Sequence, residues 1–255
     1  MIARNQDDPV NFVLSAGRTG TVFLTRLFEP VSNVQVVHEP FPARYELMLA
    51  NMRNDFGLGK SLVRKLFLSS RKKRYASLSQ NEKFIEVNPL MCPLVDLLKE
   101  LDRTIHVVHM VREPLSWVKS ISAFQASKYV RPFYPYIPFS TPFPSPRPAG
   151  WEKLNSTERQ LWRWRFCNEQ ILAQREHFSR YSLVRYEDLF SQDQSKRMEN
   201  VKSICETFEI PIDLVDTTSA FQQRQNPAPA RSVAPVNEQV AFDICSDFPR
   251  QLGYA

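Results

Sequence analysis

The chain has few cysteines and no long apolar run. Only four cysteines occur in 255 residues, and none of them shows the C-x-x-C spacing of zinc sites. The longest apolar runs are far shorter than the roughly 20 residues of a membrane-spanning helix, and the N-terminal MIARNQDDPV lacks the apolar core of a signal peptide. The sequence therefore predicts reduced core cysteines, no metal site and no membrane span, in a soluble, cytoplasmic protein.

The overall composition is typical of a globular protein that binds anions. Hydrophobic residues make up 43% and charged residues 24%, and the length suits one α/β domain. The net charge of +6 favours anionic ligands, although it does not separate a nucleotide from nucleic acid or a membrane surface. We interpret the basic run at residues 71–74 as a solvated helix end, with a binding patch as the alternative.

Strand and helix patterns alternate through most of the chain. Apolar and β-branched runs predict strands at 12–14, 34–37, 84–87, 104–111 and 181–185. Between and after them, helical spacing predicts helices that include 43–52, 58–68, 157–178 and 198–208. Such alternation indicates an α/β fold of three layers, α/β/α, with a central parallel sheet.

The stretch from Asn11 to Phe28 predicts a strand, an anion-binding loop and a helix. Residues 15–20 have the composition of a turn, and the apolar residues after them share one helical face. A helix N-terminus directs backbone N–H groups and the positive end of its dipole at one point, where phosphate or sulfate binds. Arg18, Thr19 and Thr21 add a cation and two hydroxyls, but a Walker A loop would have Lys in place of Thr21.

A second candidate phosphate site follows the long predicted strand at 104–111. Arg112 ends this strand, and Ser120 comes eight positions later in the next predicted helix. Arginine offers a planar fork of donors to a phosphate, and serine adds a hydroxyl. Because parallel strands end at one edge of the sheet, this site should lie beside the first loop.

A segment rich in proline and aromatic residues occupies about 129–150. So many prolines are incompatible with the interior of a helix or with a central strand, and the aromatic residues argue against a fully solvated linker. We predict a lid or substrate-facing loop, with a loop that packs on the body as the alternative.

At these motifs the chain resembles the sulfotransferases that use 3′-phosphoadenosine 5′-phosphosulfate (PAPS). Arg18 to Val22, preceded by Gly17, is similar to their R-S-G-T-T signature for the 5′-phosphosulfate, with Thr19 for Ser and Val22 for the second Thr. Arg112, Pro114 and Ser120 match R-x-P-x-x-x-x-x-S, which holds the 3′-phosphate. Residues 184–189, VRYEDL, resemble a third family stretch, in which Tyr186 would lie near the adenine.

The resemblance implies one sulfotransferase domain over residues 1–255, with a fold like that of P-loop nucleotide hydrolases. It also implies sulfuryl transfer from PAPS to a hydroxyl or amine without a metal, with Arg18 and the loop N–H groups stabilising the developing charge. The acceptor would be a small molecule, a glycan or a lipid, not a nucleic acid. Two alternatives stay open, namely a non-catalytic nucleotide- or polyanion-binding domain and a P-loop nucleotide kinase.

The general base that the resemblance implies is Glu39. Cytosolic members of the family carry a catalytic His where this chain has Glu86 to Pro89, whereas Golgi and many bacterial members place a Glu after the second strand. Glu39 occupies that position, so the chain looks closer to the bacterial and Golgi type. His38 and Glu86 are the alternates for the base.

Overall fold

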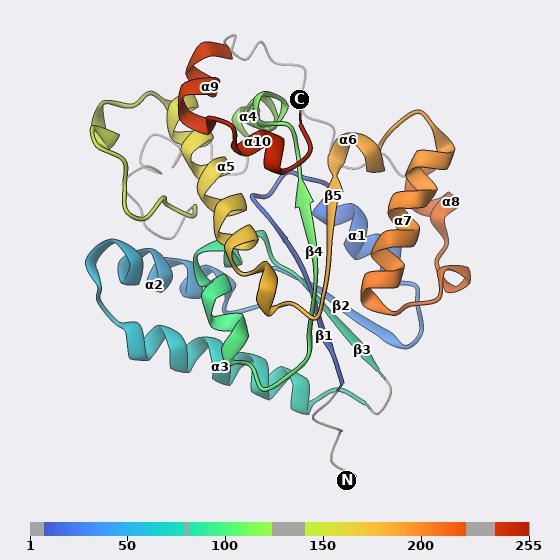
Figure 1. Cartoon of the computed structure of the whole chain (residues 1–255). Coiled ribbons are helices and arrows are strands. Elements are labelled where there is room, and N and C mark those ends of the chain that lie inside the picture. Colours follow the sequence, from blue (N-terminus) through green and yellow to red (C-terminus); the bar gives the residue numbers. More distant parts are fainter. Residues whose placement is uncertain (1–7, 80–81, 124–140, 223–237, 255) are drawn as a thin grey trace.

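Five parallel strands form one sheet at the centre of the protein (Figure 1). The structure is a computed structural model that describes residues 8–79, 82–123, 141–222 and 238–254. The strands are β1 (Val10–Ser15), β2 (Val34–His38), β3 (Lys83–Val87), β4 (Ile105–Val111) and β5 (Arg180–Arg185), in the spatial order β2-β3-β1-β4-β5. The predicted parallel sheet and its strand positions are confirmed.

The central strand β1 pairs with β3 on one side and with β4 on the other. Val13 aligns with Val87, and Ser15 aligns with Met110. The chain runs from β1 out to β2, returns through β3 and then crosses β1 to reach β4. The carboxyl ends of all strands therefore meet at one edge, beside the point where the strand order reverses, which is where ligands bind in open α/β sheets.

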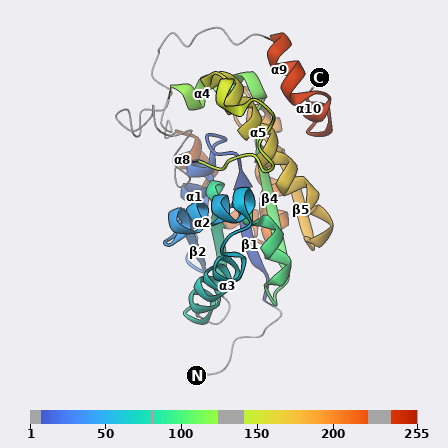
Figure 2. The ribbon, with the colours of Figure 1, turned by 90° about the vertical axis from the view of Figure 1, so that its left-hand side faces the viewer.

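Helices cover both faces of the sheet, which confirms the three-layer prediction (Figures 1 and 2). One face is covered by α1 (Thr21–Phe28), α6 (Tyr186–Leu189), α7 (Gln194–Phe208) and α8 (Thr217–Gln222). The other face carries α2 (Ala43–Phe56), α3 (Lys60–Ala76), α4 (Pro114–Ser122), α5 (Ser156–Ala173), α9 (Glu238–Cys245) and α10 (Phe248–Gln251). Short 3₁₀ helices lie at Trp151–Lys153, Arg175–His177 and Ile212–Leu214.

The alternation of side chains along the strands divides the core in two. Val13, Ile85 and Val108 belong to the cluster that packs with α1 and α7, whereas Phe12 and Phe84 belong to the cluster on the other face. Successive residues of a strand point to opposite faces, so one buried strand supplies both clusters.

The ends of the predicted helices differ from the structure. Helices α2 and α3 extend beyond the predicted 43–52 and 58–68, α5 ends at Ala173 instead of 178, and α7 begins at Gln194 instead of 198. The apolar segment Pro89–Glu100 is a 3₁₀ helix with Pro93 inside it, because a proline there removes a backbone donor and disfavours a regular α-helix.

The interpretation of residues 71–74 as a solvated helix end is wrong for Arg71. This side chain is only 1% exposed and forms ion pairs of 2.7 Å with both Glu46 and Glu86. Residues 63, 67, 71 and 75 recur at every fourth position of α3, and all four are buried. The helical period therefore places Arg71 on the core face, where burial of the cation requires partners of opposite charge.

The described part of the predicted lid packs on α2. The Asn51 side chain donates to the Thr141 carbonyl over 2.8 Å, and the Ser145 hydroxyl donates to the Asn54 carbonyl over 2.8 Å. Phe143 is buried against the Trp151 ring. Residues 141–150 thus behave as a loop packed on the body, and the rest of the predicted lid, residues 129–140, lies outside the described residues.

Candidate active site

The loop between β1 and α1 coils tightly at the carboxyl edge of the sheet. Gly17, Arg18 and Gly20 have positive φ angles of 82°, 55° and 89°, which turn the chain directly into α1. The backbone N–H of Gly17 donates to the Ser15 hydroxyl over 3.0 Å. No side chain caps the N-terminus of α1, and the Phe23 N–H donates to the Gly20 carbonyl over 2.9 Å. The N–H groups of Thr21 and Val22, before Phe23, are therefore the first-turn donors that can bind an anion.

Gly20 occupies its position for two separate reasons. Its φ of 89° lies in the left-handed region, which side chains disfavour. A Cβ at this position would also lie 2.7 Å from Cε2 of Phe190 and 3.6 Å from the Tyr186 ring. The loop therefore packs directly against the residues that follow β5.

The hydroxyl residues of the predicted signature lie at this turn. Thr19 is 1% exposed, and its Oγ1 has no hydrogen-bond partner among the described residues. Thr21 and Val22 begin α1, with Thr21 buried and Val22 partly exposed. A buried hydroxyl without a partner is unfavourable, and a bound anion near the loop would give Thr19 an acceptor.

Two further residues, on α4 and α5, hydrogen-bond to the loop backbone, and the sequence analysis did not identify them. Nε1 of Trp117 in α4 donates to the Gly17 carbonyl over 2.6 Å, and Nη2 of Arg163 in α5 donates to the Ala16 carbonyl over 3.2 Å. Both side chains are buried, and burial lowers the pKa of Arg163. Trp117 could have been identified because it lies inside the motif that runs from Arg112 to Ser120. Arg163 could not, because an arginine in an amphipathic helix is normally expected to be solvated.

Arg112 joins the end of β4 to the loop. Its Nη1 donates to the Arg18 carbonyl over 3.3 Å, and its Nε donates to the Ser116 hydroxyl over 2.9 Å. Ser120, which is buried, lies one helical turn beyond Ser116 on the same side of α4. The guanidinium also lies 4.2 Å from the centre of the Tyr186 ring. The fold thus brings Arg18, Arg112 and Tyr186 together.

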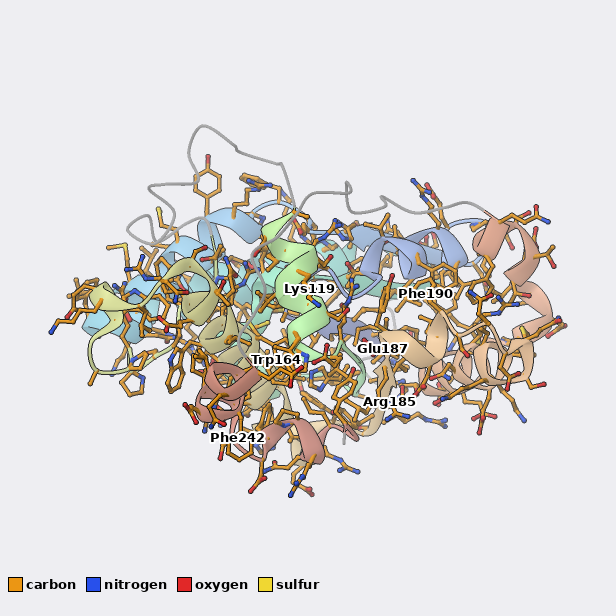
Figure 3. The ribbon with its side chains drawn as sticks, turned by 90° about the horizontal axis from the view of Figure 1, so that it is seen from above. Lys119, Trp164, Arg185, Glu187, Phe190 and Phe242 are labelled. Carbon is orange, nitrogen blue, oxygen red and sulfur yellow. The ribbon has the colours of Figure 1, made fainter. Side chains whose placement is uncertain are left out.

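The electrostatics of this corner favour an anion. Burial lowers the pKa of Arg18, and repulsion from Arg112 lowers it further. Two neighbouring guanidinium groups repel each other, and a phosphate or sulfate between them would replace that repulsion by attraction. Figure 3 looks down on this edge of the sheet and shows Glu187 of α6, and Phe190 just after α6, next to α4, which carries Lys119. The contact between α4 and α6 includes a hydrogen bond of 3.0 Å from the Glu113 N–H to the Glu187 carboxylate.

The three candidate bases differ sharply in their surroundings. Glu39 follows β2 with a positive φ of 44°, and its N–H donates to the Val87 carbonyl over 2.9 Å. Within the described residues, no hydrogen bond or ion pair engages its carboxylate. Burial lowers the pKa of the adjacent His38, while the charge of Glu39 raises it. An unengaged carboxylate on strained backbone at a strand end has the features of a functional group.

Glu86 is instead part of a buried ion cluster. It is fully buried in β3, where it pairs with Arg71 at 2.7 Å and Arg74 at 3.1 Å. The Asn88 side chain donates to the same carboxylate over 2.9 Å. These contacts favour a structural role for Glu86 and leave Glu39 and His38 as the candidates at the carboxyl edge.

Neither a metal site nor a membrane span is found in the described ranges. No group of three or more His, Cys, Asp or Glu side chains there could hold a metal ion. No helix in that part of the chain is both long and apolar enough to cross a bilayer.

Two solved structures share this architecture. The sulfotransferase domain of the Synechococcus PCC 7002 olefin synthase matches with a TM-score of 0.52, covering 98% of this chain and 97% of that domain at 15% identity. A sulfotransferase from Alicyclobacillus acidocaldarius matches with a TM-score of 0.54, covering 98% of this chain and 94% of that one at 14% identity. The chain has the sulfotransferase fold. No protein-family model and no curated protein matches it.

The candidate site lies at one edge of this fold. Both neighbours are bacterial proteins. The loop after β1, the arginine after β4 and the carboxylate after β2 all lie at the carboxyl edge of one parallel sheet. The roles of these residues rest on their own contacts in this chain.

Proposed function

We propose that this protein transfers a sulfuryl group from PAPS to a hydroxyl or amine of an acceptor molecule. The observation that carries the proposal is the contact between the two predicted phosphate sites, in which Arg112 Nη1 donates to the Arg18 carbonyl over 3.3 Å. One cation follows β1 and the other follows β4, so two anion sites lie side by side. Such a pair suits a nucleotide that carries phosphate groups at two separate positions.

The residues present fit this cofactor. The N–H groups of the loop and of the α1 N-terminus, with Arg18 and the buried Thr19 hydroxyl, would hold the 5′-phosphosulfate. Arg112 and Ser120 would hold the 3′-phosphate. Tyr186 already lies against the guanidinium of Arg112 and offers a ring to the adenine. When bound, the cofactor supplies a sulfuryl group attached to its 5′-phosphate.

Residues of the protein would take up the acceptor proton and stabilise the charge on the leaving group. Glu39 would accept the proton that the acceptor hydroxyl or amine loses when it takes up the sulfuryl group, which the cofactor would supply with its 5′-phosphate as the leaving group. Arg18 and the loop N–H groups stabilise the negative charge that collects there. Trp117 and Arg163 hold two loop carbonyls from below, which keeps the loop in position for this task.

Two measurements separate the proposal from its rivals. In titration calorimetry, adenosine 3′,5′-bisphosphate should bind more tightly than ADP or ATP by about 1.5 to 3 kcal/mol, the range for hydrogen bonds to a charged group. Tighter binding of ATP would support a kinase. Sulfuryl transfer from labelled PAPS should then occur on a panel of alcohols, phenols and amines. Binding without transfer to any of them would support a non-catalytic nucleotide-binding domain.

A further inference from the structure

The helix α3 carries an excess of positive charge. It contains seven lysines and arginines and no acidic residue. Its three arginines pair with acidic residues of neighbouring segments, Arg64 with Glu100, Arg71 with Glu46 and Glu86, and Arg74 with Glu86. Lys60, Lys65, Lys72 and Lys73 are exposed and form no ion pair with any described residue. These four charges are not compensated within that part of the chain.

Large apolar side chains are exposed at the start of the same helix. Phe56 is 68% exposed, and Leu58 and Leu62 are each 56% exposed. Phe56 ends α2, Leu58 lies on the turn between α2 and α3, and Leu62 lies in the first turn of α3. A Cβ at Gly57 or Gly59 would meet no atom within 4 Å. The turn thus projects from the body. Clustered apolar side chains on a soluble surface mark a binding surface more often than scattered ones do.

A shallow hollow of about 540 Å³ connects the apolar and basic parts of this surface. Leu62 and Leu68 contribute its apolar lining, while Lys65 and Lys72 contribute positive charge. Lys65 and Lys72 are seven residues apart, so they lie two turns apart on the same side of α3. Figures 1 and 2 show α3 as an outer helix of the protein.

We propose that the α2–α3 turn and the outer side of α3 dock this protein on an anionic lipid bilayer. The lysines would contact the headgroups, and Phe56, Leu58 and Leu62 would enter the boundary between headgroups and acyl chains. The exposed lysines favour a polyanionic partner because of their charge. The exposed apolar side chains at the turn favour a bilayer over a nucleic acid, because a bilayer offers an apolar interior in which they can be buried. The arginines that could fork onto nucleic-acid phosphates are already held by carboxylates.

The test is sedimentation of the full chain with lipid vesicles, without any nucleotide. Vesicles that combine phosphatidylcholine with phosphatidylglycerol should bind the protein, and vesicles of phosphatidylcholine alone should bind it much more weakly. Lys65→Gln with Lys72→Gln should weaken binding about 30-fold, since each surface lysine contributes about fivefold. Leu58→Ser with Leu62→Ser should weaken it at least about tenfold, because burial of each leucine is lost.

The matched control is Lys153→Gln with Lys202→Gln, which removes the same charge from exposed positions outside α3. This variant should bind the anionic vesicles nearly as well as the unaltered protein. All substituted side chains are exposed, and unchanged melting temperatures would show that the variants are folded.

Three results would overturn the proposal. The first is an absence of binding to the anionic vesicles. The second is an equal loss of binding in the control pair, which would reflect net charge alone. The third is that duplex DNA displaces the protein from the vesicles while the Leu58→Ser, Leu62→Ser variant binds the vesicles as well as the unaltered protein does. That result would indicate a surface for nucleic acid instead of a bilayer. None of these results bears on sulfuryl transfer, so the two proposals can fail separately.

Discussion

The guanidinium carbon of Arg112 lies 4.2 Å from the centre of the Tyr186 ring, so the residues that follow β4 and β5 are in contact. The same guanidinium donates to the Ser116 hydroxyl and to the Arg18 carbonyl. These three contacts fix the plane of the Arg112 guanidinium before any ligand binds. A donor group that is already oriented loses less conformational entropy when it binds a phosphate.

Arg112→Ala should weaken the binding of adenosine 3′,5′-bisphosphate by about 1.5 to 3 kcal/mol, because it removes charged hydrogen bonds to the 3′-phosphate. Adenosine 5′-phosphosulfate, which lacks that phosphate, should lose much less. Calorimetry with both ligands measures the difference. Ser116→Ala is the matched control, since it removes one anchor of Arg112 and keeps the guanidinium. Equal losses for both ligands in Arg112→Ala would refute the assignment of the 3′-phosphate site.

Glu39→Gln should lower kcat by roughly 10² to 10⁴, the span of general-base catalysis. Cofactor affinity and melting temperature should hardly change, because no described residue forms an ion pair with this carboxylate. Turnover must be measured with an acceptor that is protonated at the assay pH. Near-normal turnover would transfer the role of base to His38, which His38→Ala would then test.

Glu86→Gln is the structural counterpart of that experiment. The carboxylate is buried between Arg71 and Arg74, and loss of one partner of a buried ion pair costs about 3 to 5 kcal/mol. We expect a lower melting temperature and an unchanged kcat for the molecules that remain folded. A large fall in kcat with an unchanged melting temperature would show instead that Glu86 acts in catalysis.

Gly20→Ala should impair both folding and nucleotide binding. The substitution puts a side chain at φ 89° and brings its Cβ to 2.7 Å from the Phe190 ring. Gly59→Ala is the matched control, since Gly59 also has a positive φ, of 66°, but meets nothing within 4 Å. The control should lose only about 1 kcal/mol of stability from the backbone conformation. Urea unfolding and calorimetry compare the two, and equal losses would show that the contact with Phe190 is unimportant.

His109 should make the protein less stable in mild acid. It is fully buried in β4, where its ring nitrogens contact the Tyr181 hydroxyl at 2.8 Å and the Asn168 side-chain oxygen at 2.9 Å. Burial lowers the pKa of His109 to about 4, whereas an unfolded chain has a histidine pKa of about 6.5. Between these two pH values the histidine is protonated in the unfolded state but not in the folded state. The contribution of His109 to the free energy of unfolding is therefore complete above about pH 6.5 and is lost as the pH falls towards 4.

The loss should reach about 3 kcal/mol across that window, at about 1.4 kcal/mol per pH unit. Urea unfolding at a series of pH values measures it. His109→Gln should have a shallower dependence of stability on pH than the unaltered protein, because the titrating ring is gone. Identical slopes for the two proteins would contradict the assignment.

Activity should persist in EDTA. In the proposed mechanism, Arg18 and Arg112 supply the positive charge at the two phosphate sites, which is the role that Mg²⁺ has in kinases. The measurement is the transfer rate from PAPS before and after addition of the chelator. Loss of activity with recovery on adding Mg²⁺ would favour the kinase alternative.

The sequence was sufficient for the strands and for the edge of the sheet where the candidate site lies. The apolar runs that predicted strands recur in β1 to β5, because a strand buried on both faces needs a nearly continuous run of apolar residues. The motifs at Arg18, Arg112 and Tyr186 directly follow strands, so a parallel sheet had to bring them to one edge. Their proximity thus follows from local pattern and topology together.

Other features depended on tertiary contacts. The sequence could not show that Trp117 and Arg163 lie under the loop, since their partners are backbone carbonyls about 100 and 147 positions away. The period of residues 63, 67, 71 and 75 puts Arg71 on the apolar side of α3, but it could not show which carboxylates would pair with a buried arginine there. Only the packing of α3 against the sheet buried Arg71 between two carboxylates and left the neighbouring lysines exposed. Periodicity assigns residues to faces, but the burial of a charge is decided by the partners that the fold brings to it.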